Sequence, residues 1–152
     1  RNRMKFNITS FLKKVLLMIL LGETKYCLES NFIIDLLNGK ENAVSLYREI
    51  KNTPLTITVI ASVVLFEIMR GKEENQNKIQ EFKELRQQLT VLPFDEKEAE
   101  EASRIEKAMH QEGQTIAPLD LLIAATAKTN NAILVSNDRD YDKIDGLRLK
   151  KY

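Results

Sequence analysis

Short apolar segments alternate along this chain with longer segments of helical periodicity. Runs rich in β-branched residues are typical of buried strands, whereas apolar residues spaced three and four apart indicate helices. The expected strands cover residues 25–29, 55–60, 90–94 and 132–136, with a fifth, edge strand at 147–151. The expected helices cover residues 30–39, 41–52, 61–71, 75–89, 95–112 and 118–129. This alternation predicts an α/β fold in which a mainly parallel sheet of four to five strands carries helices on both faces.

Four acidic residues interrupt or end these apolar segments. Glu29 closes the first expected strand, and Glu67 lies about two turns into the helix after the second strand. Asp120 follows Pro118 at the start of the last expected helix, and Asp138 comes just after the fourth strand. Ligands of open α/β sheets bind outside the carboxyl ends of the strands, so we expect all four side chains to reach one crevice. Because buried carboxylates without partners are costly, the cluster predicts a shared counter-ion, most simply a divalent metal ion.

Each acid taken alone also has a structural interpretation. Asp120 could stabilise the positive end of its helix dipole, and Glu67 could pair with Arg70 one turn later. The segments 55–69 and 115–127 contain no Lys or Arg, so any other basic partner would have to come from elsewhere in the chain. Taken together, the four acids favour the metal site over four separate structural roles.

The composition narrows the catalytic chemistry of a chain of 152 residues, which suits one domain with a substantial core. Its single cysteine, Cys27, excludes an internal disulfide and a thiolate-rich zinc site, which indicates a reducing compartment and predicts a cytoplasmic protein. The single histidine, His110, is expected at the surface, so Ser-His and Cys-His catalysis are excluded unless His110 itself serves. None of the five glycines lies in a P-loop or dinucleotide-binding motif.

Residues 1–24 differ from the rest of the chain. They hold five basic residues and one acidic residue, a net charge of +4, whereas the remaining 18 basic and 21 acidic residues give −3. The body is therefore not a basic nucleic-acid-binding module, and bound cations or local Lys/Arg clusters would have to attract a polyanion. The run VLLMILL is too short to span a bilayer and precedes no small-residue cleavage site, so we expect no membrane association, a weak signal peptide being the alternative. We treat residues 1–24 as an N-terminal extension of uncertain status.

Carboxylates without histidine or thiolate ligands form an all-oxygen site. Such a site suits Mg²⁺ or Mn²⁺ and suits zinc or copper poorly. Two such ions can activate a water molecule and stabilise the attacking and leaving oxygens of a displacement at phosphorus. The sequence therefore predicts hydrolysis of a phosphodiester bond.

Three segments carry a resemblance to a known family: YCLESNFIIDLLNG, VIASVVLFEIMRG, and the stretch from FDEKEAEEAS to NDRDYDKIDGL. In order and spacing they resemble the PIN-domain ribonucleases of the VapC toxin type, most specifically over residues 114–141. The resemblance implies a PIN-like nuclease domain at residues 25–152. The acids that it implies for catalysis and metal binding are matched by Glu29, Glu67, Asp120 and Asp138. A secondary set is formed by Ser136, Asp140 and Asn31.

The resemblance also implies an activity and partners. It implies a Mg²⁺- or Mn²⁺-dependent endoribonuclease that cleaves RNA, is held inactive by a cognate antitoxin protein and commonly forms a homodimer. The first acid of the family is normally aspartate, and this chain departs from the pattern with Glu29 in LESN. The extra methylene extends the carboxylate by about 1.3–1.5 Å, and misplacement on that scale can cost on the order of 100-fold in rate. The alternative function is therefore a catalytically impaired PIN-like module that binds RNA or protein.

Overall fold

The protein is described here by a computed structural model that covers residues 7–71 and 76–152. The basic residues Arg1, Arg3 and Lys5 and the expected helix start at Asn75 lie outside the described residues. The strands are β1 (Thr24–Leu28), β2 (Thr56–Ala61), β3 (Thr90–Leu92), β4 (Ile133–Val135) and β5 (Leu149–Lys150). The helices are α1 (Ile8–Leu21), α2 (Ser30–Leu37), α3 (Glu41–Asn52), α4 (Ser62–Arg70), α5 (Gln76–Arg86), α6 (Glu96–Gln111), α7 (Pro118–Thr129) and the 3₁₀ helix η1 (Asp140–Lys143).

The sheet has the order β3-β2-β1-β4-β5, and each neighbouring pair of strands is parallel. The predicted α/β class, strand number and edge position of the last strand are confirmed. β3 ends at Leu92, two residues earlier than predicted, because Pro93 has no N–H to donate to a sheet partner. The central strand β1 pairs Leu28 with Val135 of β4, so the residues after these two strands emerge side by side.

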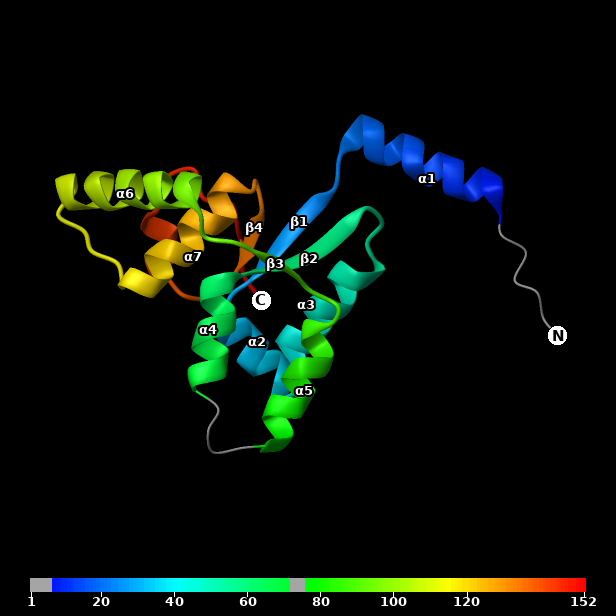
Figure 1. The fold of residues 1–152 in the computed structure, drawn as a ribbon, viewed down its shortest axis with the longest axis horizontal. Coiled ribbons are helices and arrows are strands. Elements are labelled where there is room, and N and C mark those ends of the chain that lie inside the picture. The colour runs from blue at the N-terminus through cyan, green and yellow to red at the C-terminus, as the bar shows by residue number, and fades with distance from the viewer. Residues whose placement is uncertain (1–6, 72–75) are drawn as a thin grey trace.

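Helices cover both faces of the sheet, as predicted. Figure 1 shows α6 and α7 together on one side of the strands and α2, α3 and α5 together on the other, while α4 contacts both α2 and α7. Helix α7 begins with Pro118 at its first position and buries six residues in the core, in agreement with its nearly continuous apolar sequence. Cys27 is also fully buried as a free thiol.

Helix α1 lies apart from this core. It projects from the amino-terminal start of β1 away from the sheet (Figure 1), and none of its residues is buried. In the described part of the chain, no helix is long and apolar enough to cross a membrane. The domain boundary at residue 25 stays a prediction.

Candidate active site

Glu29 occupies the position that the strand register creates at the carboxyl end of β1. Because Leu28 pairs with Val135, Glu29 lies next to Ser136, whose Oγ donates a hydrogen bond to Glu29 Oε2 at 3.4 Å. The Glu29 carboxylate also accepts the Asn31 N–H at 3.0 Å, so it caps helix α2. The Asn31 side chain is exposed, and Asn31 contacts this site through its backbone N–H. Glu29 is only 3% exposed, so its carboxylate is buried at the carboxyl end of the central strand.

Asp138 and Asp140 follow β4 in a tightly hydrogen-bonded turn. The N–H of Asp138 donates to Ser136 Oγ at 3.1 Å, and the N–H of Asp140 donates to Asp138 Oδ1 at 2.8 Å. Ser136 therefore links the Asp138 turn to Glu29. The Asp140 carboxylate forms an ion pair with Lys143 at 2.5 Å, so this acid belongs to the rim of the site.

Glu67 reaches the same region from helix α4. Its carboxylate accepts a hydrogen bond from the hydroxyl of Ser30, the residue next to Glu29. Arg70 does not pair with Glu67 as the structural interpretation suggested; its guanidinium lies 5.4 Å from the centre of the Phe66 ring. A helix turns by about 100° per residue, so Glu67 faces α2 while Phe66 points outward.

Asp120 lies in the first turn of α7, where the negative charge also suits the helix dipole. Its Oδ1 accepts a hydrogen bond from the hydroxyl of Tyr141 at 3.0 Å. Tyr141 is fully buried and belongs to η1, directly after Asp140. Ser136 thus links Glu29 to the Asp138 turn, while Ser30 binds Glu67 and Tyr141 binds Asp120.

Burial and the neighbouring acids raise the pKa values of Glu29 and Asp120. The pKa of Glu29 is raised to about 7, chiefly by burial; the Asn31 hydrogen bond opposes this rise, and the charges of Asp120 and Glu67 contribute to it. Burial also raises the pKa of Asp120, with the Tyr141 hydrogen bond opposing this and the charges of Asp138, Glu67 and Asp140 adding to it. Such mutual effects require the carboxylates to be close in space.

The donor chemistry of this cluster fits a divalent cation. Within residues 7–71 and 76–152, the carboxylates of Glu29, Glu67 and Asp120 form no ion pair with Lys or Arg. Neutral hydroxyl and amide donors hold them, so their negative charge is not compensated. No three acidic, histidine or cysteine side chains in the described residues are already arranged to hold a metal ion, so the carboxylates would have to turn toward one. An all-oxygen set of this charge suits a hard divalent ion.

Comparison with known proteins identifies the family, because residues 26–147 match the PIN domain family. The chain belongs to the PIN-domain family. It is 35% identical over 129 residues to "Ribonuclease VapC" of Rickettsia bellii, covering 80% of this chain and 91% of the relative. It is 26% identical over 132 residues to "tRNA(fMet)-specific endonuclease VapC" of Shigella flexneri, covering 84% and 98% of the two chains. The fold is also similar to that in a Rickettsia felis VapBC2 structure with promoter DNA, with a TM-score of 0.75, 24% identity, and coverage of 85% of this chain and 99% of that chain.

Glu98 is another buried carboxylate of this PIN domain, and it has a structural role that the sequence does not single out. Glu98 is fully buried, and its oxygens accept hydrogen bonds from the N–H of Asp95 at 3.1 Å and from the Thr129 hydroxyl at 2.8 Å. Asn130 adds a third donor at 3.3 Å. Despite burial, the hydrogen bonds from Thr129 and Asp95 and the charge of nearby Lys97 lower the pKa of Glu98. Asp95 and Glu98 also form a capping box at the start of α6.

Sequence reasoning also missed Ser30 and Tyr141 as members of the site. Ser30 follows Glu29 directly, and Tyr141 follows Asp140 in the segment NDRDYD. Their positions beside predicted acids were a signal, but a serine or tyrosine next to an acid is common in loops. Only the packing of α2 against α4, and of η1 against α7, brings their hydroxyls to Glu67 and Asp120.

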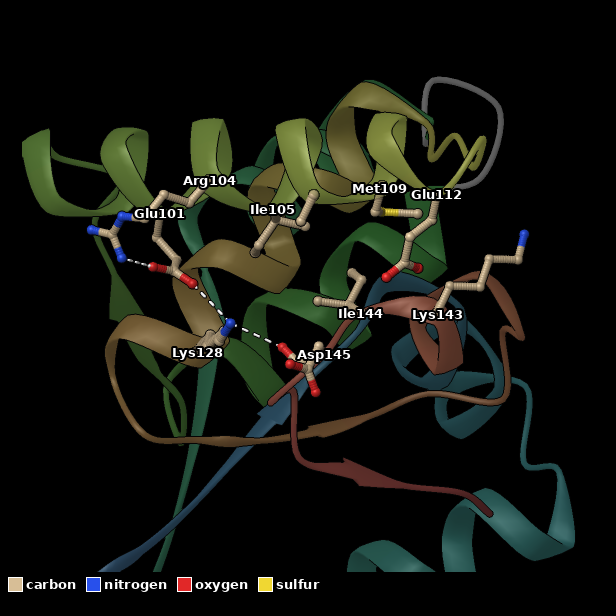
Figure 2. A pocket seen from close by; sticks show the side chains of 10 residues that line it. Glu101, Arg104, Ile105, Met109, Glu112, Lys128, Lys143, Ile144 and Asp145 are labelled. Carbon is tan, nitrogen blue, oxygen red and sulfur yellow. Dashed lines mark hydrogen bonds and ion pairs between the residues drawn. The ribbon is translucent and has the colours of Figure 1, made fainter.

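A separate hollow of about 270 Å³ lies between α6, the end of α7 and the loop after η1 (Figure 2). Figure 2 shows Lys128 between the carboxylate of Glu101 and Asp145. The Lys128 Nζ lies 2.9 Å from Glu101 Oε1 and 2.9 Å from the Asp145 carbonyl oxygen. Arg104 also pairs with Glu101, which is only 8% exposed. This PIN domain therefore balances the buried charge of Glu101 with two cations, in contrast to the four acids of the site.

Lys128→Met is expected to lower the free energy of unfolding by about 1–3 kcal/mol, because it removes a charged donor from the buried Glu101 carboxylate. Urea denaturation at pH 7 measures this change. Lys97→Met is the matched control: Lys97 is exposed and 3.7 Å from Glu98, so its loss should cost less than about 1 kcal/mol. Equal losses in the two variants would contradict the expectation.

Proposed function

We propose that this PIN domain is a metal-dependent endoribonuclease and the toxin component of a toxin–antitoxin pair. The observation that carries the proposal is the gathering of Glu29, Glu67, Asp120 and Asp138 at the carboxyl edge of the sheet, where neutral donors hold three of the carboxylates. A hydrolase of phosphodiester bonds needs a cation at such a place, because its substrate and its acids are both negative. The full-length similarity to VapC ribonucleases supports RNA as the substrate.

Glu29, Asp120 and Asp138 would hold a divalent ion in this proposal, and Glu67 would complete the set. Mg²⁺ or Mn²⁺ fits the oxygen-only donors. When bound, such an ion supplies activation of water and stabilisation of negative charge at phosphorus. Ser136 has a supporting role, since its single hydroxyl orients both Glu29 and the turn that carries Asp138.

Basic residues at the rim of the acidic cluster would receive the RNA backbone. Lys143 and Arg139 are exposed in the segment that carries Asp138, and Lys151 Nζ lies 2.9 Å from the Asp138 carbonyl oxygen. Residues 25–152 carry a net negative charge, and these three cations would offset it locally where RNA binds. Contacts between cations and phosphates make binding depend on salt concentration. Asp140 holds Lys143 at this rim.

The proposed partners are an RNA substrate, a cognate antitoxin protein and a second copy of the chain in a homodimer. The similarity to the Rickettsia felis VapBC2 structure, in which that complex is bound to a DNA fragment from its promoter, supports the antitoxin. The free, buried thiol of Cys27 agrees with action in the reducing cytoplasm.

We assign the nuclease to residues 25–152, with residues 1–24 as an extension outside it.

Incubation of the purified protein with RNA tests the proposal. We expect internal cleavage of the RNA with Mg²⁺ or Mn²⁺ and its loss on addition of EDTA. Cleavage that continues unchanged in EDTA would contradict the metal dependence. Protein that binds RNA with a divalent ion present and never cleaves it would support the impaired module instead.

Glu29→Asp is expected to raise kcat/KM for RNA cleavage, by no more than about 100-fold, because it removes the methylene that displaces the carboxylate from the family's usual position. Aspartate is a preferred helix cap, so the hydrogen bond to the Asn31 N–H should survive. Initial rates at saturating Mn²⁺ measure the effect. A lower rate in Glu29→Asp would show that this site is built around glutamate.

A further inference from the structure

Hydroxyl groups hold three of the four acids of this site. Ser30 donates to Glu67, Ser136 donates to Glu29, and Tyr141 donates to Asp120. A hydroxyl sets the direction of a carboxylate without neutralising its charge, whereas Lys or Arg would do both. A carboxylate held in this way stays available to a cation. The pattern therefore suits groups that orient metal ligands rather than groups that replace a metal ion.

Tyr141 differs from the two serines in its rigidity. Its side chain is fully buried, and its hydroxyl lies 3.0 Å from Asp120 Oδ1. A buried ring with few rotamers fixes its hydroxyl more firmly than a serine Cβ does. The hydrogen bond from the phenol holds Oδ1 and so restricts rotation of the Asp120 carboxylate.

The turn that carries Tyr141 is itself tied to the other acids. Asp140, its neighbour, donates its N–H to Asp138 Oδ1, and Asp138 donates its N–H to Ser136 Oγ. Ser136 in turn donates to Glu29. One hydrogen-bonded segment after β4 thus orients acids that come from β1, β4 and α7.

We infer that Tyr141 is a positioning residue of the metal site, whose hydroxyl presents the Asp120 carboxylate to the divalent ion. This inference rests on the proposed function. Partners that orient metal ligands typically contribute 10–100-fold to metal affinity or activity. Tyr141 would act through Asp120 and would not touch the RNA.

The test compares Tyr141→Phe with Tyr152→Phe and the unsubstituted protein. Tyr152 is a matched control, because its hydroxyl also donates to an aspartate carboxylate, Asp35 Oδ2 at 2.9 Å, outside the acidic cluster. Mn²⁺ binding is measured by calorimetry at pH 8, where Glu29 is ionised. We expect the Kd for Mn²⁺ to rise about 10–100-fold in Tyr141→Phe and to stay within about twofold in Tyr152→Phe.

A second measurement separates positioning from folding. The Mn²⁺ concentration for half-maximal RNA cleavage should rise by the same factor as the Kd in Tyr141→Phe, whereas a partly unfolded variant would lose kcat at an unchanged Mn²⁺ requirement. Thermal melts in EDTA check that both variants fold. Wild-type affinity or tighter binding in Tyr141→Phe overturns the inference and leaves the proposed function standing. Absence of Mn²⁺ binding by the unsubstituted protein overturns both.

Discussion

Asp120→Asn is expected to lower kcat/KM for RNA cleavage by about 100-fold or more, because it removes one charge from the set that would hold the divalent ion. The substitution keeps the shape of the side chain, and its amide oxygen can still accept the Tyr141 hydroxyl. The pKa of Asp120 is raised in the folded protein, so a neutral side chain at this position relieves repulsion and should not destabilise the fold. Initial rates over a range of Mn²⁺ and RNA concentrations measure the loss.

Asp145→Asn is the matched control for this prediction. Asp145 is an exposed aspartate in the loop beside the hollow of Figure 2, and its backbone carbonyl, not its carboxylate, accepts Lys128. Its substitution should leave the rate within about twofold, since exposed changes away from a site have small effects. Cleavage that survives both EDTA and Asp120→Asn would falsify the proposed mechanism.

The stability of the metal-free protein is expected to fall by about 2–3 kcal/mol between pH 5 and pH 8 through Glu29 alone. The pKa of Glu29 is about 7 in the folded protein, against an ordinary value of 4.5 that applies to the unfolded chain. Between these two values the folded state retains a proton that the unfolded state releases. The stabilisation is therefore complete below pH 4.5 and is lost as the pH rises through 7.

Urea denaturation in EDTA at several pH values measures this dependence. Glu29→Gln stays neutral, so its stability should match that of the unsubstituted protein near pH 5 and exceed it by about 2–3 kcal/mol at pH 8. Glu98→Gln is the contrasting control, because the pKa of Glu98 is lowered and its loss should destabilise the protein at pH 8. Parallel curves for the unsubstituted protein and Glu29→Gln across this range would contradict the expected role of Glu29.

Glu29 and Glu98 show where sequence reasoning reached its limit. Both are buried glutamates near the start of a helix, yet the pKa of one is raised and that of the other is lowered. Glu98 has hydrogen-bond donors from Asp95, Thr129 and Asn130, whereas Glu29 has acidic neighbours. Residues from distant segments make this difference, so local spacing cannot predict it.

The order of strands and helices followed from the sequence because it depends on local properties. β-Branched runs, apolar spacing and Pro118 are short-range signals, and they located the five strands and helices α2 to α7 to within a few residues, whereas α1 and η1 were not predicted. The parallel sheet followed in turn, since strands separated by helices require crossover connections. Placement of the four acids at the carboxyl edge was part of the same prediction.

The sequence by itself thus determined the α/β architecture and the four acids that interrupt, end or follow its apolar segments, because these features depend on near neighbours along the chain. Only the tertiary structure decided which hydroxyls bind three of these carboxylates: Ser30 binds Glu67, Ser136 binds Glu29, and Tyr141 binds Asp120. It also decided that Arg70 lies over the Phe66 ring and does not pair with Glu67. Hydrogen bonds and charge effects depend on distance in space and on burial, and both are established only when the helices pack on the sheet.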